Sequence, residues 1–335
     1  MVFKVDFNSD GRLLRDYLRT TCRITRGMLI KLKKTEGGIK LNGAPVTVRA
    51  LLKTGDIIEL SDADSPKDEN PYVIAGGILP EIIYQDEALM VFNKPSGMPT
   101  HTSRGHTESC LANSVCAYFR DKGQPFVFRP VNRLDKDTSG AVMIAKNKYY
   151  SAILSRSMWN GEIKKVYLAV TEGEAPKEGK IEGYIKRVDK SIIKRKLCLE
   201  REPDSAGSLT YFRTIGTCGG KSLVMVFPIT GRTHQIRLHL AYIGLPICGD
   251  TLYGSSSECI ERQALHAVSL TFPSPIDGRS VKVMAEPPND IKKLIEKYSL
   301  ADIPRDCEWA SYFMNNFSSE TLFEKSVSEA SQNFS

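Results

Sequence analysis

The sequence predicts an α+β protein with a largely antiparallel central sheet. Turn signals separate pairs of short strand-like runs; Gly219-Gly220, for example, lies between runs at Ser208 to Ile215 and Ser222 to Ile229. Helical periodicity is confined to a few segments, among them Leu111 to Phe119 and the stretch that Asn147 can cap. A chain of 335 residues is long enough for one sizeable core and a small additional domain.

One stretch, Arg129 to Lys146, combines a charged loop with a buried strand. Gly140 and its polar neighbours suit a tight turn, and Ala141 to Ala145 is typical of a short buried strand. Asp135 is therefore expected on a loop beside the core. A structural alternative is a turn carboxylate capped by Thr138 or Ser139.

Four motifs in this chain occur together in one known family. The segment NRLDKDTSG, which contains Asp135, resembles the HRLDxxTSG signature of the RluA-type pseudouridine synthases, which isomerise uridine in structured RNA. NKPSGMPTH from Asn93, KKVYLAV from Lys164 and GRTHQIRLHLAYIGLPICGDTLYG from Gly231 resemble further blocks of that family. The chain departs from the signature at Asn132, where the family usually has His.

The resemblance implies the pseudouridine synthase fold, a largely antiparallel mixed sheet, and a reaction that needs no cofactor. It implies Asp135 as the catalytic carboxylate, Tyr167 as an active-site aromatic residue, and Arg232 as the cation that clamps Asp135. Asp135 can attack C1′ or C6 or remove a proton from C2′, and the sequence does not choose among these. Four further positions are expected to bind the substrate: Arg133, Leu134, Thr138 and Leu265.

Positive charge is concentrated near the N-terminus. Between Gly11 and Lys40 there are nine basic residues and two acidic ones, an excess that equals the formal net charge of +7. Two short amphipathic helices and an Asn42-Gly43 hairpin are predicted here, and the pattern resembles an S4 RNA-binding domain. A solvated helical face without a ligand is the alternative. The candidate RNA-binding residues are Arg12, Arg15, Arg23, Arg26, Lys33 and Lys34.

These features divide the chain into four parts. Ser61 to Pro71 is acidic and polar with two prolines, which is typical of a linker. We expect an S4-like domain at 1–62, a linker at 63–76, the catalytic domain at 77–299 and a C-terminal extension without assigned function at 300–335. The basic run Lys186 to Lys196 is predicted to form a hairpin or loop over the substrate channel, with a solvated ribbon as the alternative.

Composition also argues against several classes of protein. No apolar run approaches the ~20 residues that a membrane helix needs. The eight cysteines are scattered, and His234 and His239 are five residues apart instead of the four of the helical zinc motif. We therefore expect no metal, no cofactor and no membrane contact, and a cytoplasmic, monomeric protein.

The function predicted from these observations is isomerisation of uridine in ribosomal or transfer RNA. One alternative is a catalytically inactive RNA-binding or ribosome-assembly protein, signalled by Asn132. The other is a carboxylate glycosidase, which would need a second acidic residue as general acid. Asp137 is the nearest candidate for that residue, but it lies only two positions from Asp135.

Overall fold

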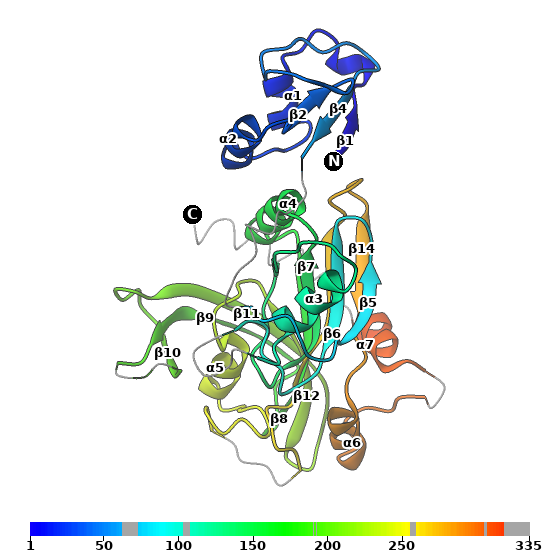
Figure 1. Cartoon of the computed structure of the whole chain (residues 1–335). Coiled ribbons are helices and arrows are strands. Elements are labelled where there is room, and N and C mark those ends of the chain that lie inside the picture. The colour runs from blue at the N-terminus through cyan, green and yellow to red at the C-terminus, as the bar shows by residue number, and fades with distance from the viewer. Residues whose placement is uncertain are drawn as a thin grey trace.

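The computed structural model describes residues 1–61, 73–102, 108–189, 191, 193–254, 259–304 and 307–317. Within these ranges there is a small N-terminal module with its own sheet and a larger unit built on a second sheet (Figure 1). The predicted linker, residues 63–76, lies mostly outside the described residues. None of the described helices is long and apolar enough to cross a membrane.

The N-terminal module has a four-stranded sheet in the order β1-β4-β2-β3. The Thr25 hydroxyl accepts a hydrogen bond from the Met28 amide and caps the second helix. Asn42 and Gly43 both have positive φ angles, 52° and 81°, as a two-residue hairpin turn requires. The predicted helices and hairpin are confirmed, whereas the first strand was not predicted. The elements are β1 (Val2–Lys4), a 3₁₀ turn η1 (Phe7–Ser9), α1 (Leu14–Thr20), α2 (Arg26–Lys34), β2 (Ile39–Leu41), β3 (Ala44–Pro45) and β4 (Ile57–Leu60).

The larger unit is built on a 10-stranded sheet, counted over the described residues. Its order is β10-β9-β11-β12-β8-β13-β7-β6-β5, with β14 paired to β13 off this path. Every pairing is antiparallel except that of β13 with β7. The α+β class and the largely antiparallel sheet are therefore confirmed. The strands are β5 (Glu81–Gln85), β6 (Leu89–Lys94), β7 (Ser139–Ala145), β8 (Lys164–Glu172), β9 (Glu178–Arg187), β10 (Arg195–Cys198), β11 (Ala206–Cys218), β12 (Lys221–Pro228), β13 (Leu265–Pro273) and β14 (Ser280–Met284).

Helices pack around this sheet, and the β9–β10 hairpin projects from its edge (Figure 1). The predicted hairpin in the basic run that begins at Lys186 is confirmed, whereas its position over a substrate channel stays a prediction. Asn147 caps α4 as predicted, because its side chain accepts hydrogen bonds from the amides of Tyr149 and Tyr150. The helices are α3 (Leu111–Arg120), α4 (Lys148–Trp159), α5 (Gln235–Tyr242), α6 (Asn289–Lys297) and α7 (Trp309–Phe317).

The parallel contact between β7 and β13 is short and closely packed. Only two residue pairs form it, His266 with Ser139 and Ala267 with Gly140. Gly140 has φ +114°, and a Cβ atom at this position would lie 2.3 Å from the Ala267 carbonyl oxygen. The buried His266 ring bridges the same junction, since its Nε2 faces the Ala285 carbonyl and its Nδ1 faces the Ser139 hydroxyl, both at 2.9 Å. Only glycine at position 140 allows the two strands to approach this closely.

The N-terminal module packs against α4. The Tyr149 hydroxyl donates a 2.7 Å hydrogen bond to the Cys22 carbonyl, and the Phe3 and Tyr149 rings meet edge to face with centroids 6.0 Å apart. Buried residues of the module and of the larger unit form one continuous apolar cluster. The module is therefore attached by packing as well as by the chain.

The described part of the predicted C-terminal extension packs on the main core. Phe313 of α7 is fully buried, and Trp309 is partly buried against the same cluster. The Lys292 ammonium lies over the Trp309 ring, 5.5 Å from its centroid. At least the first part of the extension thus belongs structurally to the larger unit.

We predict that Gly140→Ala destabilises the protein by at least about 2 kcal/mol, because it combines a positive φ with a backbone clash. Gly161→Ala is the matched control, since Gly161 also has a positive φ, +73°, but no atom lies within 4 Å of its added Cβ. Its cost should be about 1 kcal/mol. Urea unfolding measures both, and equal costs would contradict the close approach of β7 and β13.

Candidate active site

Asp135 lies on the loop that leads into β7. The Thr138 amide donates to the Asp135 carbonyl at 3.2 Å, which closes the turn. The Asp135 side chain keeps 27% of its surface exposed. Its Oδ2 faces an arginine, while its Oδ1 has no hydrogen-bond partner among the described residues. One carboxylate oxygen is therefore available to a substrate.

Two buried side chains, Lys94 and Thr100, donate hydrogen bonds to the backbone of this loop. The Lys94 ammonium donates to the carbonyls of Pro95, Met98 and Lys136 at 2.8, 2.7 and 3.0 Å. Burial lowers the pKa of Lys94 to about 7, and the charges of Asp137 and Asp135 act in the opposite direction. The Thr100 hydroxyl donates to the Leu134 carbonyl and accepts from the Leu134 amide, at 2.9 and 3.2 Å. The backbone on both sides of Asp135 is thus fixed.

The cation that pairs with Asp135 is Arg237 of α5. Its Nη1 donates to Asp135 Oδ2 at 3.1 Å. Its Nε and Nη2 form a bidentate pair with the buried Asp250, at 2.6 and 2.8 Å. Burial alone would lower the pKa of Arg237, but the two carboxylates outweigh it and raise that pKa. Asp250 therefore orients the guanidinium, which in turn holds Asp135.

A second contact to Asp135 comes from His234, the residue that precedes α5. His234 has φ 59° and ψ 18°, a left-handed conformation that is uncommon for residues other than glycine. Its Nε2 lies 3.8 Å from Asp135 Oδ2, and its Nδ1 lies 3.1 Å from the Tyr253 hydroxyl. Burial lowers the pKa of His234, although the charge of Asp135 opposes this shift. The Tyr253 hydroxyl also accepts from the Arg195 amide at 3.0 Å, so a chain of contacts connects the β9–β10 hairpin to Asp135.

Tyr167 faces the same region from β8. It pairs with Ala267 of β13, which in turn pairs with Gly140 of β7, so the three strands bring Tyr167 close to the Asp135 loop. Burial raises the pKa of the Tyr167 hydroxyl, and the charge of Asp135 acts in the same direction. Lys165 precedes it by two residues and thus shares its face of the sheet. Burial lowers the pKa of Lys165 to about 8, with a further decrease from Arg232.

The expected ion pair between Arg232 and Asp135 is wrong. Arg232 is exposed, and its Nε donates to the Gly207 carbonyl at 2.9 Å. The left-handed backbone at His234 separates Arg232 from the helix, so that Arg237, the third residue of α5, points at Asp135 instead.

The other predicted substrate-binding residues differ in exposure. Arg133 is exposed, and its Nη2 lies 3.4 Å from the Thr233 hydroxyl. Thr138 is buried and accepts a hydrogen bond from Gln263, whereas Leu134 and Leu265 belong to the apolar core. Leu134, Thr138 and Leu265 are therefore buried positions that support the Asp135 loop from the core.

Asn132, the departure from the family signature, is bound to the neighbouring strand. Its amide nitrogen donates to the Ala141 carbonyl at 3.1 Å, and its oxygen accepts from the Met143 amide at 2.8 Å. The side chain is buried and both polar groups are used. Asn132 thus anchors the loop to β7, and this arrangement gives no reason to infer lost catalysis.

Asp135 lies just before β7, and the buried Arg237 holds its carboxylate. This arrangement makes Asp135 a candidate acid, base or nucleophile. Comparisons with known proteins identify the class of the protein. The sequence model of the family described as RNA pseudouridylate synthase matches residues 88–242. The chain is 36% identical over 276 residues to the uncharacterized RNA pseudouridine synthase YjbO of Bacillus subtilis, covering 82% of this chain and 95% of that protein.

A further relative and two solved structures agree with this result. The ribosomal large subunit pseudouridine synthase D of Zymomonas mobilis is 33% identical over 235 residues, which is 66% of this chain and 74% of that protein. The fold resembles human RNA pseudouridylate synthase domain containing 4, with a TM-score of 0.53 and 22% identity over 67% of this chain and 94% of the other. For human RNA pseudouridylate synthase domain containing 1 the TM-score is 0.51, with 24% identity over 69% and 100% of the two chains. The chain belongs to the RNA pseudouridine synthase family, and it is an isomerase that acts on RNA.

Sequence reasoning missed Arg237, Asp250 and Tyr253 and gave His234 no catalytic role. One signal could have found the first two. Arg237 lies within the apolar helical run that begins at Gln235, and a buried arginine requires an acidic partner.

We predict that Arg237→Gln destabilises the protein by about 3–5 kcal/mol, because Asp250 is left buried without its cation. The same change at Arg232 should alter the free energy of unfolding by less than about 0.5 kcal/mol, since Arg232 is exposed. Urea denaturation of both variants tests the assignment. A larger loss at Arg232 than at Arg237 would refute it.

Proposed function

We propose that this protein isomerises a uridine of ribosomal RNA to pseudouridine, with Asp135 as the carboxylate that attacks the nucleoside or removes its proton. The observation that carries the proposal is the Asp135 carboxylate, held through Oδ2 by Arg237 and open at Oδ1. A single ionised carboxylate can form a covalent intermediate or act as a base without a cofactor. Ribosomal RNA is favoured because relatives named ribosomal large subunit pseudouridine synthase D align over most of this chain.

The remaining residues have roles that suit this reaction. A uridine in folded RNA must leave the helix stack to reach Asp135, and unstacking costs a few kcal/mol. Arg133, exposed at the edge of the site, is proposed to occupy the space that the base vacates. The Tyr167 ring is proposed to stack on the extruded base, as aromatic residues commonly do with unpaired nucleotides. No second free carboxylate is needed, and Asp250 is fully engaged by Arg237.

The N-terminal module is proposed to be an S4-like RNA-binding domain that increases affinity for the substrate. Its helices α1 and α2 carry basic side chains on their outer surfaces while their apolar sides are buried. Such a surface binds phosphate groups and releases counterions on binding. Its proposed site of action is the cytoplasm, where ribosomal RNA is present.

We predict that Asp135→Asn abolishes isomerisation and leaves the fold and RNA affinity nearly unchanged. An amide of almost the same shape is too poor a nucleophile and base to replace the carboxylate. Ribosomal RNA transcribed with tritium at C5 of uridine should release label to water with the wild-type protein and none with the variant. Asp137→Asn is the matched control, and it should retain release.

Two outcomes would contradict this proposal. A variant that releases label at the wild-type rate would exclude Asp135 from the chemistry. A wild-type protein that releases none from ribosomal RNA but does so from transfer RNA would move the substrate to transfer RNA.

We also predict that neutralising exposed charges of the module weakens RNA binding and its dependence on salt. Truncation is a poor test, because it would uncover the apolar surface around Tyr149. The variant changes Arg15, Arg23, Arg26 and Lys33 to Gln, and its control changes four exposed basic residues of the larger unit to Gln, namely Lys122, Arg279, Lys282 and Lys293. For each phosphate that the variant no longer neutralises, the slope of log K against log salt should fall by about 0.7 to 0.9. Equal slopes for variant and control would count against the module's role.

A further inference from the structure

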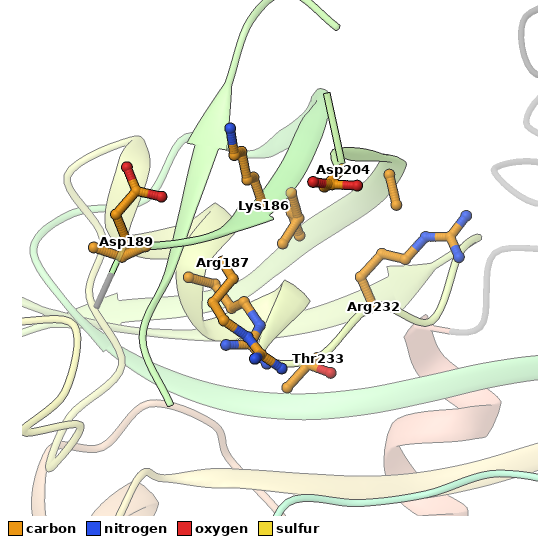
Figure 2. A pocket seen from close by; sticks show the side chains of 10 residues that line it. Lys186, Arg187, Asp189, Asp204, Arg232 and Thr233 are labelled. Carbon is orange, nitrogen blue, oxygen red and sulfur yellow. The ribbon is translucent and has the colours of Figure 1, made fainter. Parts of the chain in front are cut away.

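A cavity of about 570 Å³ lies between the β9–β10 hairpin and the start of α5. Figure 2 shows Arg187 and Asp189 of the hairpin on one side and Arg232 on the other, with Arg187 extending towards Thr233. The volume is in the range of sites that hold small ligands, about 300–1,000 Å³. None of the reaction steps described above uses this cavity.

Its lining is basic, and two of its cations remain available to a ligand. Lys186 is paired with Glu202 at 3.3 Å, and the Arg195 guanidinium donates to the carbonyls of Ile193 and Lys194. Arg187 has no ion pair within the described ranges of the chain. Within the part of the chain that the structure describes, Arg232 donates only through its Nε, to the Gly207 carbonyl, and both terminal nitrogens remain as donors. Arginine presents paired donors in a planar fork that matches the oxygens of a phosphate group.

The cavity is connected directly to the Asp135 loop. Thr233 lines it, and the Thr233 hydroxyl accepts from Arg133, which lies two residues before Asp135. The next residue, His234, faces Asp135 itself. Arg195 lines the cavity as well, and its amide donates to Tyr253, the partner of His234. A group bound here would therefore be close to the nucleotide on which Asp135 is proposed to act.

We propose that this cavity binds a single phosphodiester of the RNA strand beside the target uridine, held by Arg187, Arg232 and the Thr233 hydroxyl. This inference rests on the proposed function, because it assumes that RNA reaches Asp135. Asp189 and Asp204 also line the cavity and oppose a ligand of higher negative charge. They favour the singly charged phosphodiester over a free phosphate dianion. The Asp204 carboxylate can also accept a hydrogen bond from a ribose 2′-hydroxyl, a group that distinguishes RNA from DNA.

The test compares the double variant Arg187→Gln, Arg232→Gln with wild type in binding a short fluorescein-labelled oligouridylate over a range of salt concentrations. With one phosphate no longer neutralised, the slope of log K against log salt should fall by about 0.7. Affinity at low salt should fall about tenfold, as expected when hydrogen bonds to a charged group are removed. Both side chains are exposed, so the variant should keep the wild-type melting temperature.

The control is Arg213→Gln paired with Lys180→Gln, which removes the same charge from the middle of β11 and from the adjacent part of its neighbour β9. Arg213 lies seven residues along β11 from Ala206 of the cavity, roughly 23 Å for an extended strand. The control should keep the wild-type slope. If the double variant and the control have the same slope, the cavity holds no phosphodiester and the proposal fails.

A second arm measures inorganic phosphate alone by calorimetry. If phosphate binds wild type but not the double variant while oligouridylate binding is unchanged, the cavity is a free-anion site and the proposal is overturned. Binding of oligouridylate does not require turnover. A wild-type protein without tritium release would therefore refute the isomerisation and leave the comparison of slopes intact.

Discussion

The architecture of the site depends on the buried Arg237 guanidinium shared between Asp250 and Asp135. A buried cation is tolerated only when its charge and its donors are matched, and Asp250 supplies that match at 2.6 and 2.8 Å. The remaining nitrogen then has a fixed direction, towards Asp135 at 3.1 Å. Asp135 is held through its Oδ2, while its Oδ1 makes no hydrogen bond within the described residues. Hydrogen bonds from Lys94 and Thr100 fix the backbone on both sides of Asp135.

Local patterns predicted much of this fold and only part of its site. Glycine turns and apolar runs located the hairpin of β11 and β12 and the cap of α4, because those features depend on neighbouring residues. The burial of Arg237 could have been inferred from its apolar helical run, but its contact with Asp135 depends on how α5 is placed in the fold, which no pattern of residue types reveals. The order of strands was equally inaccessible, since β13 pairs with both β7 and β8 across long stretches of chain.

The N-terminal module keeps its basic residues and its apolar packing residues on different sides of its helices. Its basic residues lie on the outer sides of α1 and α2, whereas its apolar residues join a cluster that continues into α4. Tyr149 of α4 makes an apolar and a polar contact with the module: its ring packs on Phe3, and its hydroxyl donates a hydrogen bond to the Cys22 carbonyl. Charge concentrated on a packed module gives the protein a directed electrostatic field and not merely a mobile basic tail.

The short contact between β7 and β13 divides the active site between two parts of the sheet. Asp135 enters with β7, while Arg237 belongs to α5, which contacts β9, β10, β11 and β12 on the other part. The ion pair between Asp135 and Arg237 therefore connects these two parts of the sheet. It joins them at the junction where the strand ladder contributes only two residue pairs.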